Sequence, residues 1–320
     1  MTTFQRLRMY NALKNGWIQD FYIHGIPLLP TQTPLDVALN GGLAQGITVL
    51  GGVASAGKSS LACQIAANVS SAGKRVLYFT LDDTWGNIYS RCMSSWTVDH
   101  KEASYYGEKP EAYSWSALKT YREQRAKLTT EEQNDFCVDT TLDKVVKTAR
   151  IFDAYTQTLA ILDSIGTVSE IENAVKSMVE ENQAPDLVIV DYLQQYQIGS
   201  PDIDKQEYTR VSEVANRLQR LSLWSGIPLL ALSSLRKQDK KDDIPSLDWY
   251  RGSAQIGYAA WAGVILTRGE DTDDGTRVVS MHVVKNKNGK SGFSLPVKFY
   301  GGFSYFKYDE NLKDTTTPPF

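Results

Sequence analysis

The chain has 320 residues, of which 42% are hydrophobic and 22% charged, and its formal net charge is −3. Apolar runs such as 187–190 and 227–232 are far shorter than the ~18 residues that a membrane span needs, and residues 1–20 lack the apolar centre of a signal peptide. We therefore expect a cytoplasmic globular protein with no membrane partner, in which any nucleic-acid site is a local basic patch.

The three cysteines, Cys63, Cys92 and Cys137, are an odd number at unrelated spacings. This pattern argues against a disulfide framework and against a zinc site. The three histidines are also too scattered to suggest a metal cluster.

In chain order, residues 1–30 form a polar and aromatic leader in which Phe4, Leu7, Tyr10 and Leu13 have helical spacing, so we expect a linker helix there. The main folded domain is expected over 31–313. The residues that follow, 314–320, are expected to be a disordered tail.

Short apolar runs within this domain alternate with segments of helical period. Most of the runs are continuous, which is typical of strands covered on both faces. From Tyr208 the apolar residues recur at helical spacing until Ser225-Gly226, a helix stop. This order predicts an α/β fold with a mainly parallel central sheet and helices on both faces. The expected strands are residues 47–51, 75–81, 159–163, 187–191, 228–233 and 263–267.

Two regions depart from this alternation. The polar, aromatic segment at about 94–150 is expected to be a helical insertion whose aromatic side chains pack rather than bind a ligand. Beyond residue 277, the runs 278–284, 292–299 and 303–308 are separated by Asn288-Gly289 and Gly301-Gly302, which predicts a C-terminal extension of antiparallel hairpins.

A glycine-rich turn follows the first expected strand of the domain. Residues 52–59, GVASAGKS, satisfy the pattern G-x-x-x-x-G-K-[ST] between a strand and an amphipathic helix. In such a P-loop the backbone N–H groups and the helix dipole hold a phosphate, the lysine reaches the terminal phosphates, and the serine hydroxyl binds Mg²⁺. The predicted nucleotide-binding residues are Gly52, Ser55, Ala56, Gly57, Lys58, Ser59 and Ser60.

Two further acidic positions complete a hydrolytic site. The apolar strand 187–190 ends in Asp191, which we expect to bind Mg²⁺ together with Ser59. The strand ending near residue 81 is followed by Asp82, the candidate general base, with Asp83 as the alternate. Aspartate is one methylene shorter than glutamate, so a water placed for the longer side chain would be poorly positioned, and we expect slow turnover.

Several stretches together resemble the motor domain of the DnaB-like replicative helicases, which has the RecA fold. The similarity runs from about residue 29 to 308. The stretches that carry it are TPLDVALNGGLAQGITVLGG, VLYFTLDDTWGNIYSR, LVIVDYLQQYQ with its Tyr-Leu-Gln, EYTRVSEVANRLQRLSLWSGIPLLALSSLRK, RGSAQIGYAA with GVILTR, and VVKNKNGKSG.

This resemblance implies a homo-oligomeric ring, commonly a hexamer, with ATP and Mg²⁺ at each subunit interface, single-stranded DNA in the centre, and replication proteins as partners. It implies that Lys285 and Lys287 reach the neighbour's γ-phosphate and that Arg91 lies near the nucleotide base. It places channel loops at 198–209 and 236–243. The phosphate contacts expected in the second loop are Arg236, Lys237, Lys240 and Lys241.

Simpler interpretations stay open for the basic segments. KNKNGK also fits an exposed hairpin turn, and the loop 236–243 fits a solvated charged loop because Asp239, Asp242 and Asp243 dilute its charge.

The sequence also departs from the family pattern. Asp82 stands where the family has its catalytic glutamate, Ser234 where it has a sensor glutamine, and Lys287 where it has a finger arginine, whose bidentate grip a lysine lacks. Acidic positions of the family appear as Gly257 and Trp261. Only residues 1–30 precede the similar region, so we expect the family's separate N-terminal domain to be missing.

These changes keep two other functions open beside an ATP-hydrolysing helicase that translocates on single-stranded DNA in replication or mobile-element maintenance. One is a slow or inactive ATPase that acts as a nucleotide-gated assembly or helicase-loading factor. The other is a recombinase-like strand-pairing ATPase.

Overall fold

The computed structural model describes residues 27–125, 127, 140–236, 244–251, 254–272 and 275–312. The helix expected in the leader and the tail expected at 314–320 lie outside these residues. None of the helices in these ranges is both long enough and apolar enough to span a lipid bilayer.

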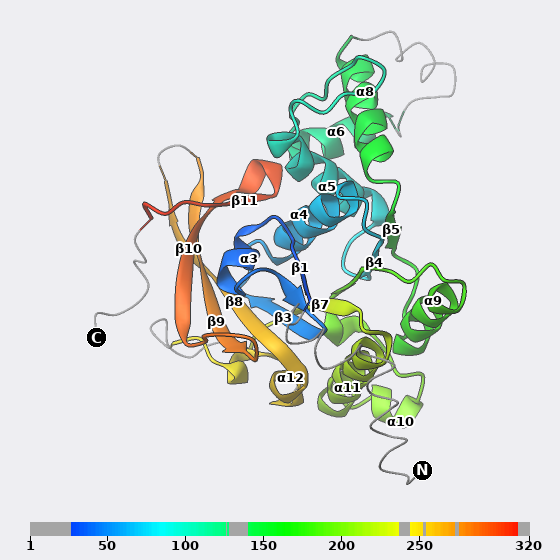
Figure 1. Ribbon diagram of the computed structural model, residues 1–320, viewed down its shortest axis with the longest axis vertical. Helices are drawn as coiled ribbons and strands as arrows, with labels where there is room; N and C mark the ends of the chain where they lie inside the picture. Colours follow the sequence, from blue (N-terminus) through cyan, green and yellow to red (C-terminus); the bar gives the residue numbers. More distant parts are fainter. Residues whose placement is uncertain are drawn as a thin grey trace, which may run out of the picture.

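A nine-stranded sheet forms the centre of the molecule (Figure 1), and six of its strands are parallel. The parallel strands stand in the order β8-β3-β7-β6-β4-β5, and the antiparallel strands β9, β10 and β11 continue the sheet beyond β8. Both parts of the predicted fold class, the parallel sheet and the antiparallel extension, are confirmed. The bounds are β3 (Gly46–Gly52), β4 (Val76–Thr80), β5 (Leu159–Leu162), β6 (Leu187–Asp191), β7 (Pro228–Ser233), β8 (Ala260–Asp271), β9 (Arg277–Asn286), β10 (Phe293–Tyr300) and β11 (Tyr305–Tyr308).

Strand β8 is longer than the expected 263–267. Its first half pairs with β3 in parallel, and β9 pairs with it in antiparallel register as far as Asp271. Pairing with β9 therefore extends β8 beyond the apolar run that is buried between helices. A small pair, β1 (Leu28–Leu29) with β2 (Leu43–Ala44), was not predicted, because the prolines at 27 and 30 obscure it.

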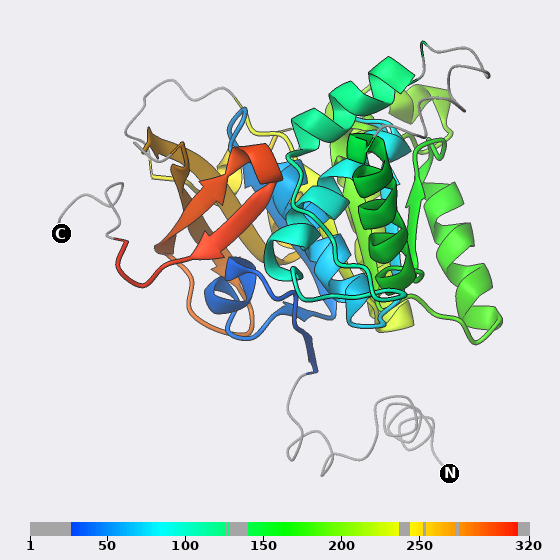
Figure 2. The same ribbon diagram turned by 90° about the horizontal axis from the view of Figure 1, so that it is seen from above.

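Helices cover both faces of the sheet (Figure 2). Successive strand residues point to opposite sides, so each strand contributes apolar side chains to the core on either face. In β4, Tyr78 joins one core, whereas Leu77 and Phe79 join the other. The first core is covered by α3 (Pro34–Ala38), α4 (Lys58–Ser71), α5 (Trp85–Asp99), α6 (Trp115–Arg125) and α8 (Thr140–Tyr155). The second is covered by α9 (Val168–Glu180), α11 (Glu207–Ser225) and α12 (Ala254–Ala259).

The segment expected as a helical insertion begins inside α5, since residues 94–99 lie within that helix. Trp96 of this segment is fully buried, stacks on His100 and contacts Phe152 edge-on. Tyr106, in contrast, is 90% exposed. Thus Trp96 packs in the core, whereas Tyr106 is exposed and contacts only the ring of Tyr105 edge-on among the described aromatic residues.

Candidate nucleotide-binding site

The glycine-rich turn joins buried strand β3 to helix α4. Val53 N–H donates to Leu266 O at 3.1 Å and Ala56 N–H to Val53 O at 3.2 Å, while Ser55 and Gly57 have positive φ of 60° and 92°. Gly57 is the N-cap of α4, and no side chain of the described residues caps that helix. The first N–H groups of α4 can therefore hold an anion.

An aromatic pair from the antiparallel extension lies directly against this turn. The rings of Phe299 and Phe306 stack with centroids 4.4 Å apart, and a Cβ added to Gly57 would come within 2.7 Å of Phe306 Cζ. Gln64 of α4 holds β11 in place, because its amide donates to Phe306 O at 3.0 Å and accepts from Phe306 N–H at 2.8 Å. The extension thus fixes the position of the phosphate loop.

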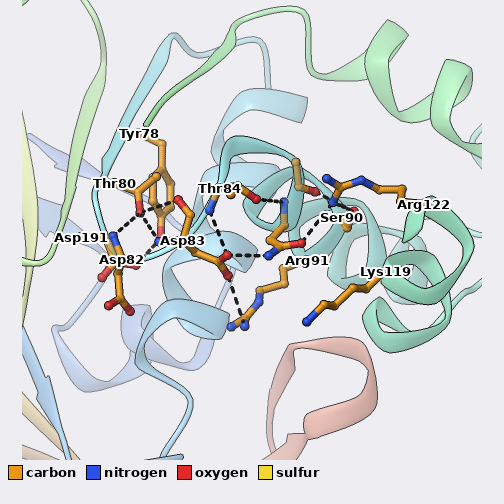
Figure 3. A network of polar contacts seen from close by, with 12 residues as sticks. Tyr78, Thr80, Asp82, Asp83, Thr84, Ser90, Arg91, Lys119, Arg122 and Asp191 are labelled. Carbon is orange, nitrogen blue, oxygen red and sulfur yellow. Dashed lines mark hydrogen bonds and ion pairs between the residues drawn. The ribbon is translucent and has the colours of Figure 1, made fainter. Parts of the chain in front are cut away.

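The predicted magnesium ligands, Ser59 and Asp191, lie beside the phosphate loop (Figure 3 shows the environment of Asp191). Asp191 is 2% exposed and accepts a hydrogen bond from Tyr78 Oη at 3.0 Å, and the Ser59 hydroxyl lies close enough to lower its pKa. Burial raises the pKa of the Asp191 carboxyl to about 6, against the effect of these two donors. A serine hydroxyl and a carboxylate are hard oxygen donors, so this pair fits Mg²⁺.

Lys58 lies at the phosphate-loop side of the site. Its Nζ donates to Gly52 O at 2.9 Å. Burial lowers the pKa of the Lys58 ammonium, whereas the charges of Asp191 and Asp82 raise it. The ammonium can exchange the Gly52 carbonyl for a phosphate oxygen.

The two candidate bases differ in what surrounds them (Figure 3). Asp83 accepts from Thr84 N–H at 2.9 Å and from Asn87 Nδ2 at 2.6 Å, and it pairs with Arg91 at 3.6 Å. Asp82 is exposed and accepts from Gln195 Nε2 at 3.3 Å. Asp82 is therefore better placed than Asp83 to receive a water proton.

Arg91 is held inside the same helical region. Its guanidinium lies 4.5 Å from the ring centroid of Trp115 and faces Asp83, and among the described residues its buried Nε has no partner. A role near the nucleotide base remains a prediction for this residue.

Lys285 and Lys287 lie away from their own phosphate loop. Lys285 is opposite Gly263, which is opposite Val49, three residues before the end of β3 and roughly 10 Å from it at about 3.3 Å per residue. Lys285 Nζ donates to Gly257 O at 2.7 Å, and Lys287 Nζ lies 5.0 Å from the ring centroid of Trp261.

The structure thus groups Lys58, Ser59, Asp82 and Asp191 at the carboxyl edge of the parallel strands, although β7 and β6 separate β3 from β4. It does not bring the two distal lysines to them. Of the residues predicted to bind nucleic acid, Arg236 is exposed just beyond β7, while Lys237, Lys240 and Lys241 lie outside the described residues.

Sequence reasoning missed several side chains around the site. Tyr78 lies in the middle of an apolar strand, Gln195 follows the expected motif without any spacing rule, and Arg277 of β9 donates to Ser55 O of the loop at 3.2 Å. The aromatic pair could have been noticed only as apolar hairpin positions.

Replacing Gly57 with alanine is expected to lower nucleotide affinity at least ~10-fold. The added Cβ collides with the Phe306 ring, and the residue must hold a positive φ, which costs about 1–2 kcal/mol. Affinity is measured with a fluorescent ATP analogue, and stability by urea unfolding.

Gly73→Ala is the matched control, because Gly73 has φ 77° and open space around its Cβ position. The free energy of unfolding of that variant should fall by about 1–2 kcal/mol or less, yet it should bind nucleotide normally. Wild-type affinity in Gly57→Ala would contradict the geometry.

Asp191→Asn is expected to raise the thermal stability of the nucleotide-free protein at pH 8, by on the order of 2 kcal/mol. The pKa of Asp191 is raised in the folded state, so its ionised form weakens folding above about pH 6, and the penalty fades as pH falls toward 4. The gain should therefore shrink at pH 5.

Thermal unfolding at the two pH values tests this. Asp186→Asn, at the other end of the same run, is the control, because Asp186 is partly exposed, accepts from Arg75 N–H at 2.8 Å and pairs with Lys74 at 3.3 Å. Equal destabilisation by Asp191→Asn at both pH values would show that the carboxylate is not penalised.

Comparison with known proteins shows the family of this chain. The model of the DnaB-like helicase C-terminal domain matches residues 29–308. A replicative DNA helicase DnaB of Buchnera aphidicola is 24% identical over 267 residues, which are 80% of this chain and 50% of that protein. A second Buchnera DnaB is 25% identical over 45% of this chain and 33% of its own length, so the chain spans half or less of these curated relatives.

Solved structures show the same fold. One of them, described as an ATPase domain, superposes with a TM-score of 0.67 at 16% identity, covering 96% of this chain and 98% of that one. A DnaB-like replicative helicase studied with primase gives 0.68 at 16% identity, covering 95% and 67%. With the phosphate loop, the Asp191 strand and a family match over residues 29–308, the chain belongs to the DnaB-like helicase C-terminal domain family.

Proposed function

We propose that this chain is a subunit of a ring-shaped ATPase, commonly hexameric, that hydrolyses ATP between neighbouring copies and uses it to move along single-stranded DNA. The observation that carries the proposal is the separation of Lys285 and Lys287 from their own phosphate loop. Lysines that lie away from their own phosphate loop can serve the loop of another copy in a head-to-tail interface.

In this proposal each residue of the site has one task. The N–H groups of the loop and Lys58 bind the triphosphate, and Asp82 accepts the proton of the attacking water. Ser59 and Asp191 hold Mg²⁺, which when bound neutralises phosphate charge. Lys285 and Lys287 of the neighbouring copy stabilise the negative charge that grows on the transferred phosphoryl group.

The proposed nucleic-acid contacts are residues 198–209 and the segment that begins at Arg236. The first was expected to be a loop, but it contains helix α10 (Pro201–Asp204) and the first turn of α11. The net charge of −3 does not attract DNA to the molecule as a whole, so binding must depend on local cations. We include Lys237, Lys240 and Lys241 in this contact on sequence grounds, and replication proteins as partners of the assembly.

A slower, switch-like ATPase is the second candidate function. It is favoured by the exposed Asp82, which meets Gln195, and by Lys287, which stacks on Trp261 and has a point charge instead of a guanidinium. Steady-state turnover separates the two candidates: strong stimulation by single-stranded DNA supports the motor, whereas tight ATP binding with negligible turnover supports the switch.

The shared site predicts complementation between two inactive variants. Lys58→Ala removes the phosphate contact, and the double variant Lys285→Ala, Lys287→Ala removes the distal lysines. In a random equal mixture about a quarter of interfaces join an intact loop to intact lysines, so we expect ATPase activity of roughly that fraction of wild type.

The mixture is compared with each variant alone at the same total concentration, with mass photometry to confirm mixed assembly. A mixed assembly with no more activity than the separate variants would contradict a site shared between subunits. Full activity of the double lysine variant alone would contradict their assigned role.

A further inference from the structure

Gln194 follows Asp191 by three residues and is 8% exposed. Its side-chain amide makes three hydrogen bonds, donating to Ser233 Oγ at 2.9 Å and to Arg251 O at 2.7 Å, and accepting from Ser234 N–H at 3.2 Å. This amide therefore connects the chain after Asp191 to two other segments.

Those segments are the two ends of one loop. Leu235 and Tyr250 form an antiparallel bridge, Arg236 N–H donates to Trp249 O at 2.8 Å, and Arg251 N–H donates to Ser234 O at 2.9 Å. The described residues on both sides thus pair at the base of the loop proposed to bind DNA, and Gln194 fastens both sides.

The backbone of Gln194 reaches the other proposed DNA loop. Its carbonyl accepts from Arg210 Nη2 at 3.0 Å, and Arg210 Nη1 donates to Asp204 O at 2.9 Å. The Asp204 carboxylate in turn accepts from Ile198 N–H at 2.8 Å and Gly199 N–H at 3.0 Å. Gln194 thus contacts the base of one segment directly and the base of the other through Arg210.

We propose that Gln194 is a positioning residue that couples the nucleotide site at Asp191 to both DNA-binding loops. The inference rests on the proposed function. A buried amide with three partners cannot shift without breaking bonds or moving its partners with it, so displacement of the chain after Asp191 moves the loop bases. Ser234 cannot supply this link, because its short side chain has a buried Oγ with no partner among the described residues.

The test uses the full chain and compares Gln194→Met with Asn68→Leu. Each change replaces a buried amide with an apolar side chain of similar size. Asn68 is 3% exposed and donates to Thr31 O at 3.3 Å and Gln32 O at 3.0 Å, at the end of α4 away from the phosphate loop. It therefore controls for general loosening of the core.

For Gln194→Met we expect ATP affinity and basal turnover within about 2-fold of wild type, and stimulation by oligo(dT) reduced at least ~5-fold, equivalent to one hydrogen bond of about 1 kcal/mol. Hydrogen exchange should accelerate at Ser234 and Arg251 and lose its response to an ATP analogue. Asn68→Leu should keep the wild-type stimulation ratio.

Wild-type stimulation in Gln194→Met, or an equal loss in Asn68→Leu, overturns the coupling role and leaves the proposed function intact. Absence of stimulation in the wild-type protein overturns the proposed motor function, and the inference with it. If Gln194→Met does not fold, Gln194→Glu keeps the acceptor for Ser234 and removes both donors. It should show the same loss of stimulation, and a normal ratio overturns the proposal.

Discussion

Helix α4 begins without a side-chain cap from the described residues, on a glycine in left-handed conformation that is pressed against a phenylalanine ring. The rest of the site is placed relative to this helix start. Lys58 and Ser59 are its first two residues, Ser59 meets Asp191, and Asp191 ends the strand next to the one that precedes Asp82. The antiparallel extension contributes Phe299 and Phe306, whose rings lie against the phosphate loop, so it belongs to the site as well as to the sheet.

The arrangement leaves charges in two places that an external group can satisfy. At the phosphate loop, burial opposes the ionised forms of both Lys58 and Asp191, and a triphosphate with its metal would supply each with a partner. Away from the loop, Lys285 and Lys287 are held by a carbonyl and an aromatic ring. Neither contact neutralises the lysine charge.

Local patterns predicted the strands, the phosphate loop and the Asp191 strand because each depends on residues close together in sequence. A continuous apolar run followed by Gly52 to Ser59 specifies a strand, turn and helix with little help from elsewhere. The paired aromatic rings, the Tyr78 bond to Asp191 and the separation of Lys285 from Lys58 depend on strand register, which no short motif encodes.

Gln194 illustrates the same limit. The Tyr-Leu-Gln run supported the family resemblance, but nothing in its spacing indicates that the amide joins Ser233, Ser234 and Arg251. Those contacts exist because β6 and β7 are neighbours and the chain returns past their ends. The substitution at Ser234 becomes interpretable only once its backbone N–H is seen to bind Gln194.

An experimental structure of the assembled protein with a non-hydrolysable ATP analogue, Mg²⁺ and single-stranded DNA tests the central claim most directly. The account predicts the γ-phosphate against the N–H groups of α4, with Nζ of Lys285 or Lys287 from the adjacent copy within about 4 Å. An empty phosphate loop, or a bound nucleotide with no lysine of another copy near it, would contradict the account.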